Sequence, residues 1–183
     1  MLRRIWVPGL LGGHVLIFWT LIVNGLLRFQ ARLDMRRVPD EPRVYAVLKE
    51  AITEPGRYVV NPPLAETGFP PGEPVFGILY GGVGHEAAGP MMFLMLCIVF
   101  VGPFIAAALL TSAAPRVLAS FRRKVLFVWS LGFLLAVMSR LTRHGIADYP
   151  LRDAAIYAAH DVVVWLLVAL VLAWRIRPEP RPA

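Results

Sequence analysis

The chain has 183 residues, of which 57% are hydrophobic, and a formal net charge of +7 at pH 7. About half of the length lies in long apolar runs, so the composition excludes a large soluble domain and leaves room for one small extramembrane module. The lone cysteine, Cys97, lies within one of these runs, so no intrachain disulfide can form.

The apolar runs have the length of membrane spans, since roughly 20 residues cross a hydrocarbon core of about 30 Å. They extend from about Ile5 to Leu27, Pro90 to Thr111, Val125 to Leu141 and Ala154 to Trp174. We predict an all-α membrane protein with four transmembrane helices and a small extracytoplasmic α+β insertion of one helix and two short strands. The first run ends without a small-x-small cleavage site, so we interpret it as an uncleaved span rather than a signal peptide.

Charged residues are divided between the two sides of these runs. One side has nine bases against one acid, which gives +8, and the other has ten bases against eleven acids, which gives −1. The bases of the first side are Arg3, Arg4, Arg116, Arg122, Arg123, Lys124, Arg175, Arg177 and Arg181, and its acid is Glu179. We therefore predict a multi-pass protein of the bacterial inner membrane. By the positive-inside rule, both of its termini lie in the cytoplasm. Because topology explains the basic charge, we expect no nucleic-acid partner.

The predicted organisation follows from these spans. Residues 1–28 form the first transmembrane helix, residues 29–89 the extracytoplasmic module, residues 90–175 the other three helices, and residues 176–183 a cytoplasmic tail. Within the module, Asp40 to Thr53 has the start signal and spacing of an amphipathic helix. We expect its apolar stripe to be buried against the strands, the membrane surface or a partner. The stripe consists of Val44, Val47, Leu48, Ala51 and Ile52.

Two candidate strands follow this helix, at Arg57 to Asn61 and at Val75 to Tyr80. Two strands and one helix are marginal as an independent unit. We therefore expect the module to rest on the membrane surface, on the chain's own spans or on another subunit.

Ionisable side chains at membrane depth are costly and are candidates for function. The sequence predicts a polar intramembrane nest near the outer ends of the spans, made of Asn24, Arg140, Tyr157, His160 and Asp161. One interpretation is an ion pair between Asp161 and Arg140 that locks helices together. The other is a site for a proton, a quinone or an ion.

His14 and His160 are the two histidines within the spans, and two such imidazoles can hold a haem iron. Their predicted depths differ by several ångströms, which disfavours a shared iron. Four residues at the outer loop ends, His85, Glu86, His144 and Asp148, have no metal-ligand spacing. We therefore predict no catalytic residue, no metal site and no cofactor, with haem or quinone as the alternative.

Small residues predict the points of close helix packing. The candidates are Gly9, Gly13, Gly132 and Ser139. We expect them to meet helices of another protein.

Short turn motifs recur along the chain, at Pro39-Asp40-Glu41, Gly56-x-Tyr58, Pro62-Pro63 and Gly89-Pro90. In this arrangement the chain resembles a loose group of uncharacterised bacterial four-span membrane proteins that carry one long extracytoplasmic loop between spans 1 and 2. The resemblance implies the topology and supplies no activity, substrate or catalytic residue.

Taken together, these features favour a non-catalytic accessory or scaffold subunit of a larger inner-membrane assembly, with respiratory and photosynthetic complexes as the candidate hosts. Its expected partners are other integral membrane subunits and membrane lipid. Two alternatives stay open, a quinone- or haem-associated redox subunit and a small transporter or sensor.

Overall fold

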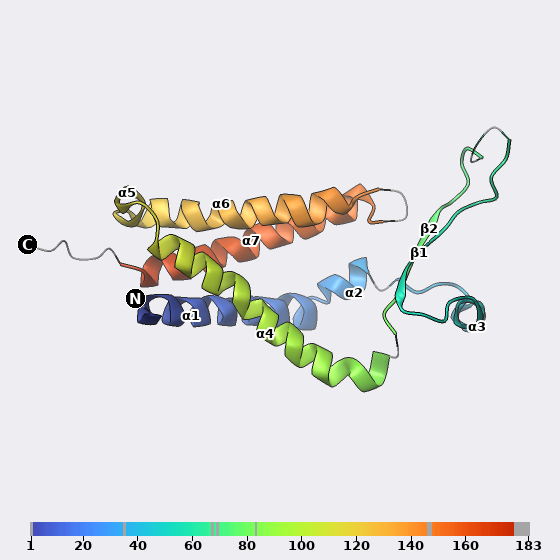
Figure 1. Ribbon diagram of the computed structural model, residues 1–183, viewed down its shortest axis with the longest axis horizontal. Coiled ribbons are helices and arrows are strands. Elements are labelled where there is room, and N and C mark those ends of the chain that lie inside the picture. The colour runs from blue at the N-terminus through green and yellow to red at the C-terminus, as the bar shows by residue number, and fades with distance from the viewer. Residues whose placement is uncertain are drawn as a thin grey trace, which may run out of the picture.

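The computed structural model describes residues 2–34, 36–66, 68, 70–82, 84–145 and 148–177, and for residues 2 and 84–88 it describes the backbone alone. Four long helices dominate it, and we call them the bundle: α1 (Leu2–Thr20), α4 (Gly84–Thr111), α6 (Phe121–Arg140) and α7 (Leu151–Arg175). Each includes a stretch long and apolar enough to cross a membrane, as the four apolar runs predicted. Helix α1 packs against α4 and α7, and α6 packs against α7 (Figure 1).

The two ends of the bundle differ in what they carry. The N-terminus, the short helix α5 (Pro115–Leu118) and the last described residues lie at one end, which we call the basic end (Figure 1). The 3₁₀ turn η2 (Leu141–Arg143) and the strands lie at the other, which we call the hairpin end. Helix α5 is too short for a periodic sequence pattern to reveal.

The first span does not continue as one uniform helix. After Thr20 the chain widens into a π-helix, η1 (Leu21–Leu26), in which the amide of Leu27 bonds to the carbonyl of Ile22 at 3.1 Å. Arg28 then takes a left-handed conformation with φ of 51°, which ends the helix and turns the chain into the short helix α2 (Phe29–Leu33). Hydrophobicity alone predicted neither the π-helix nor α2, because the residues of both continue the pattern of the first span without a visible break.

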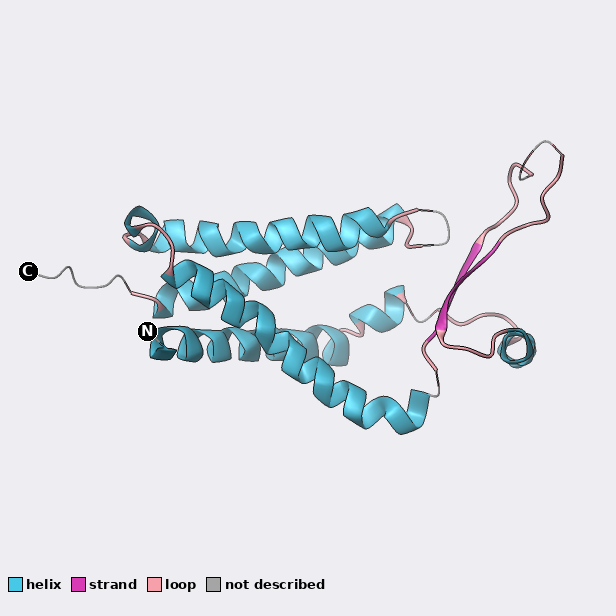
Figure 2. Ribbon diagram, viewed as in Figure 1, coloured by secondary structure: helices cyan, strands magenta, loops and turns pink. Residues whose placement is uncertain are grey.

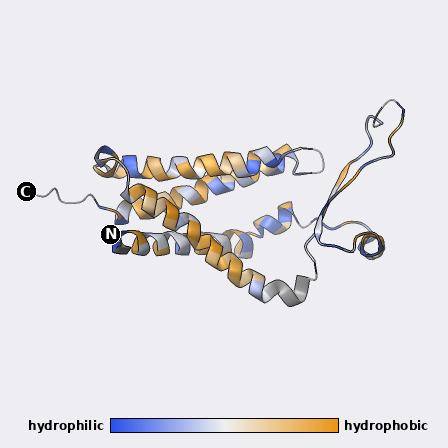
Figure 3. Cartoon of the chain, in the orientation of Figure 1, coloured by the Kyte–Doolittle hydropathy of each residue, from blue (hydrophilic) through white to orange (hydrophobic). Residues whose placement is uncertain are grey.

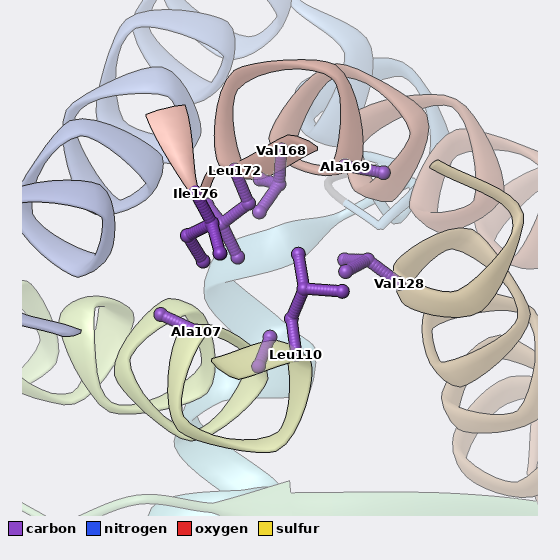
Figure 4. Close-up of a cluster of buried hydrophobic side chains, with 8 residues drawn as sticks. Ala107, Leu110, Val128, Val168, Ala169, Leu172 and Ile176 are labelled. Carbon is purple, nitrogen blue, oxygen red and sulfur yellow. The ribbon is translucent and has the colours of Figure 1, made fainter. Parts of the chain in front are cut away.

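A compact hydrophobic core joins the helices near the basic end (Figure 4). Leu110 of α4 points between Val128 of α6 and the α7 side chains Val168 and Leu172, and all four are fully buried. The buried core shared by these three helices therefore lies toward the basic end.

Glycines make the closest contacts between the helices. A Cβ placed on Gly13 would lie 2.0 Å from the Phe100 ring, and one on Gly9 would lie 2.4 Å from the Phe104 ring. On α6, a Cβ on Gly132 would lie 2.2 Å from the Cβ of Trp165. The expectation that these glycines meet foreign helices is wrong, because the chain's own aromatic side chains occupy the space above them.

Ser139 differs from these glycines because its side chain stays exposed, so its predicted contact with a foreign helix stays a prediction. Its hydroxyl donates to the Leu135 carbonyl of its own helix at 2.7 Å, and the side chain is exposed. Gly12, which the sequence analysis did not single out, packs instead, since its Cβ would lie 2.9 Å from Leu172 and Pro103.

The segment between the first two spans contains the predicted helix and both predicted strands. Helix α3 (Glu41–Ala51) is followed by β1 (Gly56–Val60) and β2 (Phe76–Tyr80), which pair antiparallel with Gly56 opposite Tyr80 and Val60 opposite Phe76. The strands begin within one residue of their predicted positions. They form a two-stranded hairpin that extends away from the bundle (Figure 2).

The apolar stripe on α3 is not buried within the chain, so the predicted burial against the strands is wrong, and burial against the membrane surface or a partner stays a prediction. Val44 and Val47 are 36% and 60% exposed, Ala51 is exposed, and Leu48 and Ile52 are half-buried. The reason is geometric: the hairpin extends away from α3, so neither strand lies across its stripe (Figure 2).

Most of the surface of the four candidate spans is also uncovered. Only 17% to 33% of the residues in the most apolar stretch of each span are buried within the chain. Residues 89–98 of α4 are all exposed, and this half of the helix diverges from the rest of the bundle as an apolar rod (Figure 3). Such surfaces require lipid or another protein.

Candidate functional site: a polar network near the hairpin end

Three helices contribute to a chain of polar contacts near the hairpin end of the bundle. Arg140 of α6 donates from Nε to Asp161 Oδ2 of α7 at 2.7 Å. The other carboxylate oxygen, Oδ1, lies 3.1 Å from Nδ1 of His160. Trp19 of α1 donates from its indole N–H to Nε2 of His160 at 2.8 Å. The network therefore links α1, α6 and α7, and it includes the ion pair that the sequence suggested.

The hydrogen bonds fix the protonation of His160. An indole N–H can only donate, so Nε2 of His160 must accept and its proton must be on Nδ1. Nδ1 then donates to Asp161, and the imidazole is neutral. The network consists of one carboxylate and one guanidinium around a neutral imidazole, so its charges balance.

Aromatic rings surround this network. Phe29 of α2 stacks on His160 with a centroid distance of 5.2 Å and an interplanar angle of 21°, and it meets the Tyr157 ring edge-on at 5.6 Å. The guanidinium carbon of Arg140 lies 5.2 Å from the centroid of the same Tyr157 ring. The left-handed turn at Arg28 is what brings Phe29 back over α7.

Tyr157 extends the polar contacts out of the bundle. Its hydroxyl donates to Asp34 Oδ2 at 2.5 Å, and Asp34 follows directly after α2. This contact ties the segment after the first span to the start of α7.

The other two polar residues singled out in the spans lie apart from the network. Asn24 lies in η1, and its side-chain oxygen is buried without a hydrogen-bond partner in the described part of the chain. His14 is exposed on α1; its Nδ1 donates to the Leu10 carbonyl at 2.8 Å, and its ring meets Phe100 edge-on at 5.4 Å. His14 lines a groove between α1 and α7 together with Trp174, whereas His160 is enclosed by Phe29 and Trp19.

This geometry bears on the two chemical interpretations. Both ring nitrogens of His160 are engaged, so an iron or a quinone oxygen would have to displace Trp19 or Asp161 to reach them. Within the described residues, no group of three or more His, Cys, Asp or Glu side chains is arranged to hold a metal ion. The side chains of His85 and Glu86 lie outside what is described. The arrangement suits a structural lock between helices.

A cleft of about 620 Å³, lined by both charged and apolar side chains, lies between the bundle and the hairpin. Arg57 of β1 pairs with Asp148 at 3.1 Å, and Arg36 pairs with Asp153 at the start of α7 at 3.5 Å. Partial desolvation acts to raise the pKa of Asp148, but the bonds from Arg57 and the Tyr149 amide outweigh it and hold this pKa below its usual value of 3.8. These ion pairs connect the hairpin segment to the bundle.

The sequence analysis missed three members of the network: Trp19, Phe29 and Asp34. Trp19 could have been found by depth, because it lies about as far from the outer end of its span as His160 does from the start of α7. Phe29 and Asp34 gave no signal, since their positions depend on the turn at Arg28.

Lys124 was counted only as a cytoplasmic charge, yet it is buried. Its ammonium donates to the carbonyls of Ala173 and Ile176 at 2.5 and 2.7 Å. It thereby satisfies free carbonyls at the C-terminus of α7, a position where cations are favourable. Near it, Arg4 donates to the carbonyl of Arg177, which joins the two termini.

Comparison with known proteins adds no relative: no protein family, curated protein or solved structure matches this chain.

Proposed function

We propose that the chain is a non-catalytic accessory subunit, inserted by four spans in a bacterial inner membrane with its basic end in the cytoplasm. Nine bases against one acid at that end support the orientation. The other end then presents α3 and the hairpin outside the membrane, where they recruit or brace another integral membrane subunit.

One observation carries this proposal: an apolar sheet face that the described chain leaves partly uncovered. Side chains alternate along a strand, and residues paired across two strands share a face. The register therefore places five apolar or aromatic side chains together, which we call the outer sheet face: Tyr58, Val60, Phe76, Ile78 and Tyr80.

The described chain covers this face only in part. Tyr58, Ile78 and Tyr80 are half-buried, and Ile78 lines the cleft beside the bundle together with Arg57 and Leu79 of the opposite face. On the outer sheet face, Val60 is 46% exposed and Phe76 is 57% exposed. Both residues lie outside the four candidate spans, so the lipid that covers the spans does not account for them.

The sheet also has open edges. It has only two strands, so each strand has one side with unpaired backbone groups among the described residues. Such an edge accepts a further strand from a partner, while the outer sheet face supplies apolar contact. The stripe on α3 adds a second apolar surface, and a shallow groove runs along it beside Val44 and Val47.

The experiment compares two neighbouring valines of β1. The chain, tagged at its C-terminus, is purified in mild detergent from its own membranes as wild type, V60E and V59E. We expect wild type and V59E to retain the same membrane partner at a fixed ratio and V60E to lose it, because only Val60 lies on the outer sheet face. Deleting the protein should weaken the assembly without abolishing its chemistry.

Two results would contradict the proposal. One is a wild-type chain that is monomeric and stable alone in its own membranes. The other is a stoichiometric haem or quinone that disappears when His14 or His160 is replaced, since an accessory role does not explain a cofactor held by those residues.

A further inference from the structure

An open groove of about 770 Å³ runs along α6 at the basic end, beside α5. Its mouth is formed by Arg116 and Arg123, and its length is apolar. The residues along its length are Val117, Leu126, Phe127, Trp129, Ser130 and Phe133.

The two arginines at the mouth are held together by a backbone contact. The Nη1 group of Arg123 donates to the carbonyl of Arg116 at 3.1 Å, which fixes its guanidinium at the mouth of the groove. Among the described residues at the basic end there is no acid to neutralise this pair. Two adjacent guanidinium groups without an acid attract an anion, and phosphate is the anion that arginine binds in a bidentate manner.

The apolar part of the groove has the depth of one leaflet. Arg123 and Phe133 are ten residues apart on α6, or about 15 Å along the helix axis at 1.5 Å per residue. This is half of a hydrocarbon core of about 30 Å. The wall is fixed, because the Trp129 indole donates to the Val162 carbonyl of α7 at 3.0 Å.

We propose that this groove binds one anionic phospholipid, with its phosphate on Arg116 and Arg123 and an acyl chain along Phe127 to Phe133. Basic pockets on the cytoplasmic side of membrane proteins bind anionic headgroups in this way. The inference rests on the membrane insertion proposed above, but not on the partner at the hairpin end. The groove would bind a lipid of the cytoplasmic leaflet and anchor α5 to that leaflet.

The test is native mass spectrometry of the purified chain in micelles that contain equal amounts of dioleoyl phosphatidylglycerol and dioleoyl phosphatidylcholine. We expect one phosphatidylglycerol to be retained at least about tenfold over phosphatidylcholine. The double variant R116Q/R123Q should lose this preference. The control R122Q/R175Q removes the same charge from exposed arginines at the same end that do not line the groove, and it should keep the preference.

A second pair of variants tests the acyl part without changing charge. Ser130 and Ser139 are both exposed on α6 and both donate to a carbonyl of their own helix, but only Ser130 lines the groove. S130L should reduce phosphatidylglycerol retention severalfold, and S139L should leave it unchanged. Equal retention of the two lipids by wild type, or equal losses in R116Q/R123Q and R122Q/R175Q, would overturn the proposal. V60E should keep the phosphatidylglycerol, because Val60 lies far from the groove in sequence and in the fold. The loss of a partner at the hairpin end can therefore be distinguished from the loss of the lipid.

Discussion

At the scale of single residues, buried and half-buried polar groups lock this bundle in two places. The Arg140–Asp161 pair with His160 and Trp19 joins three helices near the hairpin end, and Lys124 closes the end of α7 at the basic end. In both places the polar groups are satisfied by hydrogen bonds within the chain. Surrounding lipid could not satisfy them, because it offers no hydrogen-bond partners.

The ion pair predicts a non-additive result. R140L leaves the half-buried Asp161 carboxylate without its charged partner and should lower the free energy of unfolding by about 1 to 3 kcal/mol, because an uncompensated charge between helices is unfavourable. The double variant R140L/D161L should be less destabilised than R140L, since it leaves no lone charge. Denaturant unfolding in micelles measures both. Strictly additive effects would show that the pair does not act as a unit.

Lys124 gives a second prediction. K124M removes the donor to two buried carbonyls at the end of α7 and should lower the free energy of unfolding by about 1 to 3 kcal/mol. R122M makes the same change of charge at an exposed neighbour and should stay within about 0.5 kcal/mol of wild type. Denaturant unfolding in micelles compares the two variants. Equal losses of unfolding free energy would mean that the positive charge at the basic end, and not the hydrogen bonds of Lys124 to the end of α7, stabilises the fold.

The sequence revealed the network only in part. The pair of Asp161 and Arg140 was predictable from helix spacing and depth, because lone charges in a span need a partner. Trp19 has a matching depth but was passed over, since a tryptophan near a span end is common at membrane interfaces. Asn24 was expected to join, but its side-chain oxygen is buried without a hydrogen-bond partner in the described part of the chain. It lies in the π-helix, which the sequence pattern did not predict.

At the scale of elements, the sequence predicted periodic segments well and turns poorly. The structure contains helices at all four apolar runs, the amphipathic helix and both strands. Each of these segments has a hydrophobic pattern, either a long apolar run or a regular spacing of apolar residues, that identifies it in the sequence. The predicted contact of α3 with the strands was wrong, since a stripe of apolar residues shows that a surface needs cover but not what covers it. The glycines of α1 and α6 were identified as packing points, but whether the neighbour is the same chain depends on the tertiary fold.

The hairpin predicts a pH dependence through Asp148. Its pKa is depressed in the folded chain, so its ion pair with Arg57 is fully present above the ordinary pKa of 3.8 and is lost as the pH falls through the lower, folded value. Nitroxide labels at Glu66 and Thr142 should give a narrow distance distribution at pH 7 that broadens below about pH 3.8. D148N should give the broad distribution already at pH 7. A distribution that does not change with pH in wild type would show that this pair does not hold the hairpin.

At the scale of the whole molecule, the account depends on which end faces the cytoplasm. We expect a cysteine in place of Glu66, in a chain that lacks Cys97, to react with an impermeant maleimide added outside intact spheroplasts. A cysteine in place of Ser120 should react only after lysis, because residues 112–124 belong to the basic end. The opposite pattern would reverse the proposed topology.

The central claim is that the outer sheet face binds another membrane subunit, and cross-linking in the cell tests it most directly. The photoreactive residue p-benzoylphenylalanine replaces either Phe76, on the outer sheet face, or Val59, which lies on the opposite face of the hairpin and is 52% exposed. We predict that irradiation joins the chain at position 76 to one protein of defined mass and leaves the chain uncross-linked at position 59. No adduct at position 76, or the same adducts at both positions, would contradict the account.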